Sequence, residues 1–143
     1  MDRLIEFSGN HLGLVSAFVV VLALLAATYL RSSLQGFKGV DPMGATQLIN
    51  HDDAVVVDVR EPKELSDGSI INSTHIPLAK FDSSVKQLEK HKDKPVIVVC
   101  RSGSRSQVAC ATLKKNGFEQ VYNLKGGILA WQGAGLPLKR SKK

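Results

Sequence analysis

The chain has 143 residues, of which 43% are apolar and 22% are charged, which is ordinary for one globular domain with an additional segment. Its formal net charge of +6 is uneven, because a basic tail at 139–143 supplies four positive charges and leaves +2 for the rest. The tail has no interleaved aromatic residues, so we expect no nucleic-acid partner. Two cysteines, ten residues apart, do not suggest a disulfide framework.

Residues 12–30 form an almost wholly apolar run after a short N-terminal tail, 1–11. At 1.5 Å per residue these nineteen positions span roughly 28 Å, close to the ~30 Å hydrocarbon thickness of a bilayer. A cleavable signal peptide is the competing interpretation, but Asp2 and Glu6, the length of the run and its bulky end at 28–30 favour an uncleaved anchor. The run also lacks the polar face of a helix packed on a globular core. We therefore expect a single transmembrane helix over 12–30.

The charges beside this run predict the side of the membrane on which the rest of the chain lies. Arg31 and Lys38 follow the run, whereas Arg3 is the only lysine or arginine before it. This small excess predicts that the C-terminal part is cytoplasmic, where a free thiol stays reduced. Residues 31–39 contain two serines and two glycines and predict a flexible linker before a domain at 40–138.

The first half of this domain alternates short helices and strands. Asp41-Pro42 predicts the start of a helix, and 54–57 predicts a buried strand with Asp58 at its carboxyl end. We expect the Asp58 carboxylate to orient a neighbouring loop rather than to act as a general base. Glu61-Pro62 predicts another short helix, followed by a loop at 70–77 that ends in a brief strand.

The second half is organised around a cysteine. Residues 95–99 are valine-rich and uncharged, as expected of a strand buried on both faces of a parallel sheet, and Cys100 follows them directly. A helix is predicted over 107–116, a last strand over 120–124 and a short helix around Trp131. Between the last two elements, Gly126-Gly127 allows the backbone to pass near the cysteine loop. Cys110 lies within the first of these helices and is interpreted as a packing residue.

The stretch 100–106 reads Cys-Arg-Ser-Gly-Ser-Arg-Ser and has the parts of an activated nucleophile. A helix N-terminus and neighbouring arginines lower the pKa of a thiol and favour the reactive thiolate, so Arg101 and Arg105 are candidate binding residues beside Cys100. Gly103 permits a tight turn. Short hydroxyl side chains that can donate hydrogen bonds or cap the helix are Ser102, Ser104 and Ser106. No side chains stand at metal-ligand spacing, so we expect no metal. The alternative is a buried structural cysteine followed by a polar turn.

The alternation of strands and helices predicts an α/β fold with an open parallel sheet and helices on both faces. The loop resembles that of the rhodanese-like family, in which a cysteine, four intervening residues and an arginine precede a helix. The resemblance covers roughly 40–138 and includes these further positions in the family's order: Asp58-Val59-Arg60, Glu64, Gly68, Ile70, Ile76-Pro77, Gly117-Phe118, Val121, Leu124, Gly126-Gly127, Trp131 and Gly135-Leu136-Pro137. Two departures are Ser69, where the family usually has histidine, and Asn72-Ser73-Thr74-His75 in place of Gly-Ala-x-Asn.

The resemblance implies a sulfurtransferase that moves sulfane sulfur from a donor such as thiosulfate to a thiol or cyanide acceptor, through a persulfide on Cys100. It also implies supporting roles for Asp58 and Arg60 and no cofactor. The layout is similar to membrane-anchored bacterial members of the family, which implies an inner-membrane location and a possible membrane-protein partner. An interaction or sulfur-carrier module is the alternative. A cysteine phosphatase or arsenate reductase is disfavoured, because the corresponding loop in those enzymes usually has one more residue.

Overall fold

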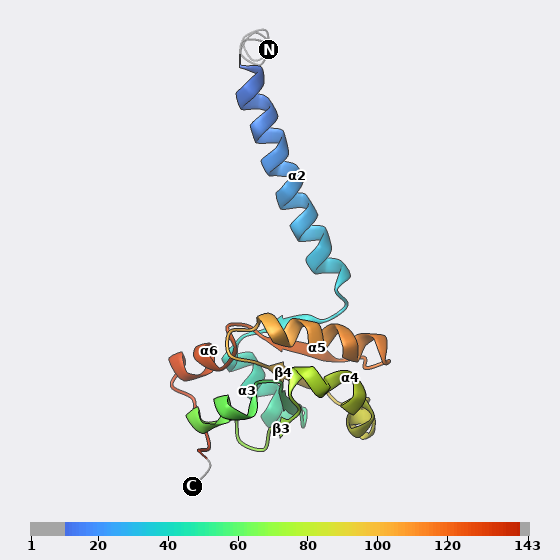
Figure 1. Cartoon of the computed structure of the whole chain (residues 1–143), viewed down its shortest axis with the longest axis vertical. Helices are drawn as coiled ribbons and strands as arrows, with labels where there is room; N and C mark the ends of the chain where they lie inside the picture. The colour runs from blue at the N-terminus through green and yellow to red at the C-terminus, as the bar shows by residue number, and fades with distance from the viewer. Residues whose placement is uncertain (1–10, 141–143) are drawn as a thin grey trace. The chain divides into compact units, whose positions relative to one another are not determined.

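The computed structural model describes residues 11–140, apart from the side chains of 31–34. Most of the expected N-terminal tail and the last three residues of the basic tail therefore lie outside the described residues. The chain forms two compact units, one that ends at Gln35 and one that begins at Gly36 (Figure 1). Each unit is described separately below.

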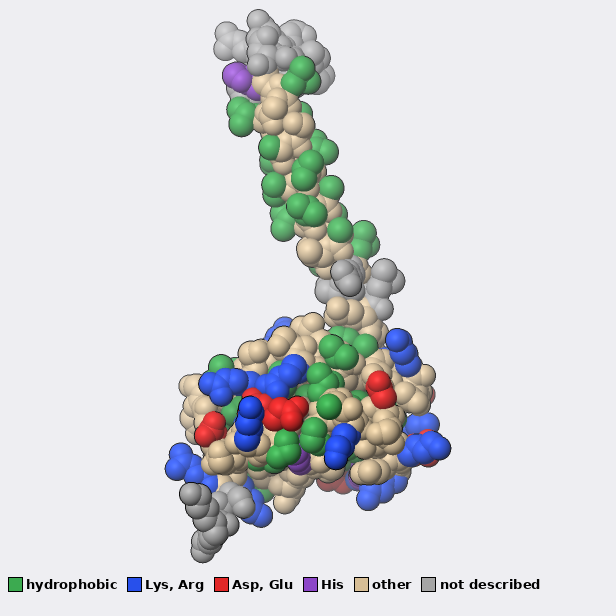
Figure 2. All heavy atoms as spheres, viewed as in Figure 1, with side chains coloured by type: hydrophobic (Ala, Val, Ile, Leu, Met, Phe, Trp, Pro, Cys, Tyr) green, Lys and Arg blue, Asp and Glu red, His purple; other side chains and the backbone are tan. Residues whose placement is uncertain are grey.

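The first unit is helix α2, Leu12–Leu34. Its stretch Leu12–Leu30 is long and apolar enough to cross a membrane and has no buried share, unlike the core helix of a globular protein. Figure 2 shows apolar side chains over the visible face of this helix. The hydroxyls of Ser16 and Thr28 donate to carbonyl oxygens one turn earlier, at 3.0 and 2.8 Å, so these polar groups are satisfied within the helix. By length and composition α2 suits a bilayer, where polar groups must be satisfied internally.

The second unit is built on a five-stranded sheet with the order β1-β5-β4-β2-β3. Every neighbouring pair of strands is parallel. The strands are β1 (Lys38–Val40), β2 (Val55–Asp58), β3 (Thr74–His75), β4 (Val96–Val99) and β5 (Val121–Leu124). Strand β4 is buried along its whole length, because it lies between two neighbours and under helices on both faces. The predicted parallel α/β fold is confirmed.

Helices cover both faces of the sheet (Figure 1). Side chains alternate between the faces of a strand, so Val96 and Val98 of β4 join one core cluster, whereas Ile97 and Val99 join the other. The first cluster is covered by α4 (Phe81–Ser84), the 3₁₀ helix η3 (Val85–His91) and α5 (Ser104–Lys115). The second is covered by α3 (Pro42–His51) and α6 (Gly127–Gly133). Two further 3₁₀ helices, η1 (Pro62–Asp67) and η2 (Leu78–Lys80), lie in the connections around β3.

The structure differs from the expected linker at 31–39. Helix α2 continues to Leu34, and Lys38–Val40 form an edge strand whose residues pair with 122–124 of β5. The strand conformation of 38–40 therefore depends on pairing with β5, which is distant in sequence.

The beginning of the expected basic tail is also paired. The backbone N–H of Ser69 donates to the carbonyl of Lys139 at 2.9 Å, and the N–H of Lys139 donates to the carbonyl of Ser69 at 2.8 Å. The Trp131 indole N–H donates to the Pro137 carbonyl at 3.0 Å. The first two bonds attach the segment after α6 to the loop that follows η1, and the third attaches this segment to α6.

Candidate active site

The loop between β4 and α5 places Cys100 at the carboxyl edge of the sheet. Cys100 follows β4 directly, and α5 begins at Ser104. Between them, Gly103 has φ +96°, and a Cβ there would lie 3.1 Å from the Leu124 carbonyl oxygen. A side chain would be both strained and crowded at this position, so the tight turn over the cysteine requires glycine.

Hydrogen-bond donors converge on the sulfur of Cys100, which is completely buried. The backbone N–H of Gly103 donates to Sγ at 3.0 Å, and the Ser106 hydroxyl lies 3.3 Å from it. Burial is the largest single influence and opposes ionisation of the thiol. The Ser106 hydroxyl and the backbone N–H groups of Ser106, Gly103 and Ser102 nevertheless outweigh burial and lower the pKa of Cys100 below its usual value. The site therefore favours a thiolate.

Asn123 of β5 contacts both Gly103 and Ser106, the two residues whose donors lie within hydrogen-bond distance of this sulfur. Its Oδ1 lies 2.5 Å from the Ser106 hydroxyl, and its Nδ2 donates to the Gly103 carbonyl at 3.1 Å. The Ser106 hydroxyl has one hydrogen, which can serve Asn123 or Cys100 at a given moment but not both. Sequence reasoning missed Asn123. The available signal was an amide within the otherwise apolar second half of β5, where a buried polar side chain needs a partner.

Arg105 is held by a carboxylate rather than by the sulfur. Its two terminal nitrogens donate to the two oxygens of Glu64 at 2.8 Å each, in a bidentate pair between α5 and η1. The hydrogen bonds from Arg105 are the main cause that holds the pKa of Glu64 at about 2. Glu64 is fixed in turn by the backbone N–H of Glu61, which donates to Oε2 at 2.9 Å. Glu64 was noted in the sequence but not as a site residue, because its partner lies 41 residues away.

Asp58 and Arg60 form a buried ion pair behind the loop. Arg60 Nη2 lies 2.7 Å from Asp58 Oδ2, and both side chains are almost completely buried. The same guanidinium donates to the carbonyl oxygens of Glu64 and Gly68, at 3.1 and 2.8 Å. Arg60 therefore ties the carboxyl end of β2 to the segment that carries the Arg105 partner. Satisfied bonds of this kind let a buried charge pair persist in a core.

The turn between β5 and α6 lies against the cysteine loop, as predicted from its two glycines. The backbone N–H groups of Ile128 and Leu129 donate to the carbonyls of Cys100 and Arg101, at 2.9 and 3.2 Å. A Cβ at Gly127 would overlap the same two carbonyls, and Gly127 has φ +58°. Only glycine permits this approach without a shift of the backbone.

Apart from Arg105, which pairs with Glu64, the structure separates the predicted loop residues into two groups. Those around the sulfur are Cys100, Gly103 and Ser106. Those with exposed side chains are Arg101, Ser102 and Ser104; the two hydroxyls among them are 3.4 Å apart. The loop thus presents buried donors inward and polar side chains outward.

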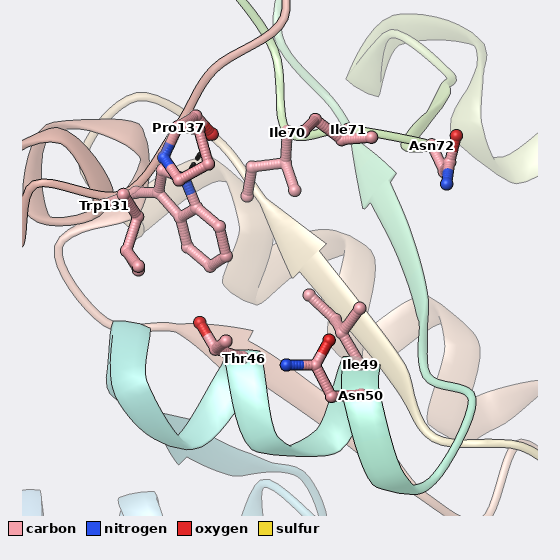
Figure 3. A pocket seen from close by; sticks show the side chains of 9 residues that line it. Thr46, Ile49, Asn50, Ile70, Ile71, Asn72, Trp131 and Pro137 are labelled. Carbon is pink, nitrogen blue, oxygen red and sulfur yellow. Dashed lines mark hydrogen bonds between the residues drawn. The ribbon is translucent and has the colours of Figure 1, made fainter.

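A different hollow of about 290 Å³ lies between α3, residues 70–72 and Trp131 (Figure 3). Ile49 and Ile70 face it, and the amides of Asn50 and Asn72 lie at its edge. Among the residues that the structure describes, no cysteine or charged side chain lines it. In this respect it differs from the loop that holds Cys100, Arg101 and Arg105.

Comparison with known proteins agrees with this geometry. A sequence profile of the Rhodanese-like domain matches residues 42–134. Over 143 residues the chain is 41% identical to the uncharacterised protein YibN of Escherichia coli, covering 99% of this chain and 100% of the relative. It is 35% identical over 98 residues to thiosulfate sulfurtransferase GlpE of Pseudoalteromonas translucida, covering 68% of this chain and 91% of the relative.

Among solved structures, a crystal structure of a rhodanese-related protein from Thermoplasma volcanium superposes with a TM-score of 0.66 at 34% identity. That match covers 73% of this chain and 100% of the other. The parallel sheet, the cysteine loop at its carboxyl edge and the matched profile agree. The chain therefore belongs to the rhodanese-like domain family.

Proposed function

We propose that the chain is a sulfurtransferase that carries sulfur as a persulfide on Cys100. The Cys100 thiolate attacks the outer sulfur of a donor such as thiosulfate. A sulfur–sulfur bond forms at Cys100, and the donor's own sulfur–sulfur bond breaks, so that sulfite leaves with the electron pair. A thiol or cyanide acceptor then takes the outer sulfur and returns Cys100 to the thiolate.

The observation that carries this proposal is the convergence of donors on the Cys100 sulfur. The Gly103 N–H and the Ser106 hydroxyl favour the thiolate, which is both the nucleophile and the leaving group of the two half-reactions. The remaining loop residues, Arg101, Ser102, Ser104 and Arg105, would bind the anionic donor. Support also comes from the relative that is named a thiosulfate sulfurtransferase.

Loop size argues against phosphate or arsenate as the substrate. Four residues separate Cys100 from Arg105, one fewer than is usual in the loops of cysteine phosphatases and arsenate reductases, so the loop encloses a smaller space around the cysteine sulfur. A module that only carries sulfur or binds a partner is the other candidate, because a fold does not by itself determine a function.

We further propose that α2 anchors the chain in the inner membrane, with the rhodanese-like domain in the cytoplasm and with a possible membrane-protein partner. The length and exposed apolar surface of Leu12–Leu30 support an anchor. The charges around the helix support the orientation.

Intact-mass measurement after incubation with thiosulfate tests the sulfur chemistry. The full chain, purified in detergent, should gain about 32 Da, the mass of one sulfur atom, and an added thiol should remove it. The Cys110→Ser variant should load equally well, whereas Cys100→Ser should not load. An unmodified mass in the presence of excess donor would reject the proposed function.

A further inference from the structure

A second hollow, which is lined mainly by polar side chains, adjoins the loop between β4 and α5. Its volume is about 440 Å³. Arg60 and Asp67 line it from the segment after β2, Arg101 from the segment after β4, and Gln132 from α6. Arg140, from the chain after α6, completes the wall. Its size falls within the range of ~300–1,000 Å³ that is usual for small-molecule sites.

The hollow lies where the topology of the sheet predicts a ligand. Strands β2 and β4 are neighbours, but the chain leaves β2 toward β3 on one side and leaves β4 toward β5 on the other. Connections that diverge in this way open a crevice at the carboxyl ends of the two strands, and ligands of open α/β sheets bind there. Arg60 and Arg101 follow those two carboxyl ends.

The pairing of Ser69 with Lys139 brings Arg140 to this crevice. The two backbone hydrogen bonds fix the residue immediately before Arg140. Gly68 makes room for the segment, because a Cβ there would lie 3.0 Å from Leu138 and 3.6 Å from Arg140. The first part of the basic tail is therefore a wall of the site rather than a free terminus.

Two guanidinium groups in the hollow are available to a ligand. Arg60 is committed to Asp58 and to two carbonyls. Arg101 and Arg140 are exposed, and within residues 11–140 neither side chain has an ion pair or hydrogen bond. Among the described residues that line the hollow, Asp67 is the only acidic one. Unpaired guanidinium forks match carboxylates in geometry as well as in charge.

We infer that this hollow binds the carboxylate end of the thiol acceptor, through Arg101 and Arg140. The inference rests on the proposed sulfurtransferase function and identifies its acceptor class: an organic thiol with carboxylates, about the size of a tripeptide. A small inorganic ion such as thiosulfate fills only part of the volume. Ile128 and Leu129 supply apolar surface for the ligand's carbon chain.

The hollow adjoins the backbone of Cys100, the residue on which the proposed second half-reaction takes place. Arg101 adjoins Cys100 in the chain, and the Ile128 N–H is bonded to the Cys100 carbonyl at 2.9 Å, so the wall is fixed to the nucleophile. The bound acceptor thiolate attacks the outer sulfur of the persulfide and forms a new sulfur–sulfur bond. The bond from Cys100 to that outer sulfur breaks, and its electron pair stays on Cys100 as the thiolate. The acceptor leaves as a persulfide, and no oxidant or reductant is consumed.

The test measures discharge of the loaded full chain in detergent by two thiols. Reduced glutathione carries two carboxylates, and its diethyl ester is the matched probe that has none. Arg140→Ala should lower the second-order rate constant for glutathione about fivefold, as expected for one exposed charge-assisted contact, and leave the ester rate unchanged. Arg140→Lys should restore part of the glutathione rate because it keeps the charge.

Lys139→Ala is the matched control. It removes a neighbouring positive charge whose side chain lines a different hollow, and it keeps the backbone pairing with Ser69. It should leave both rates unchanged. An equal effect of Arg140→Ala on both thiols, or no effect on either, would overturn the acceptor site. A chain that never gains sulfur from thiosulfate fails at the earlier loading step, which rejects the proposed function separately.

Discussion

Replacement of Ser106 by alanine isolates one of the contacts that favour the Cys100 thiolate. The hydroxyl lies 3.3 Å from the sulfur, and Ser106 is completely buried, so water cannot easily take its place. A hydrogen bond to a charged group contributes ~1.5–3 kcal/mol, and the bond to Asn123 competes for the same hydrogen and reduces that share. Since about 1.4 kcal/mol corresponds to one pH unit, the ionisation midpoint of Cys100 should move about one unit to the alkaline side.

The assay is the rate of iodoacetamide alkylation against pH, in a Cys110→Ser background that leaves one thiol. Ser104→Ala is the matched control, because its hydroxyl is exposed and contacts only the Ser102 hydroxyl, at 3.4 Å. The control should keep the parent midpoint. Thermal unfolding of each variant shows whether the fold is retained.

A Ser106→Ala profile that coincides with that of the parent would refute this reasoning. It would mean that the backbone N–H groups alone hold the thiolate and that the Ser106 hydroxyl stays with Asn123. An equal alkaline movement in Ser104→Ala would instead indicate a general loosening of the helix N-terminus.

Glu64→Gln should lower the free energy of unfolding by about 1–2 kcal/mol at pH 7, after allowance for the partial exposure of Arg105. Because the folded pKa of Glu64, about 2, lies below its unfolded value, this stabilisation is present at neutral pH and is lost as the pH falls from about 4.5 toward 2. Denaturant titrations should therefore show a smaller difference between parent and variant at pH 3 than at pH 7; a constant difference would contradict the ion pair. Gly127→Ala should cost about 2–4 kcal/mol, because the new Cβ overlaps the cysteine loop, whereas Gly133→Ala, with open space around it, should be neutral or stabilising. Comparable melting temperatures for the two glycine variants would show that the close approach is not required. Replacement of both Val20 and Leu24 by arginine costs ~2.5–3.5 kcal/mol for each charge at mid-bilayer, so this double variant should move to the soluble fraction. Recovery of the unmodified chain in the soluble fraction would contradict the membrane anchor.

Local patterns in the sequence predicted the parts of the site that are formed locally. The strand before Cys100, the turn at Gly103 and the helix that follows lie within about twenty consecutive residues, and each depends on composition or backbone freedom at its own position. The close approach of the β5–α6 turn was predicted in the same way, from a pair of glycines. Such features need no knowledge of what the rest of the chain contributes.

The parts that were missed depend on contacts between distant segments. Arg105 appeared to be a cation for the sulfur because its partner, Glu64, lies 41 residues earlier in the chain. Asn123 reaches the loop only through the pairing of β5 with β4. The strand Lys38–Val40 has three residues, one of them glycine, and obtains its order from β5 about 84 positions later. Strand propensity depends so strongly on neighbours that no local rule identifies such a segment.

The second thiol of the chain bears on where transferred sulfur can go. Cys110 is completely buried in α5, and burial raises the pKa of its thiol well above the ordinary value, with the nearby Cys100 adding to the effect. Its Sγ lies 3.6 Å from the Tyr122 carbonyl, to which it donates. A thiol that stays protonated at neutral pH is a poor nucleophile and does not resolve a neighbouring persulfide into a disulfide. On the proposed reaction, a loaded chain therefore keeps its sulfur until an acceptor arrives, and the ratio of carried sulfur to protein has a ceiling of one.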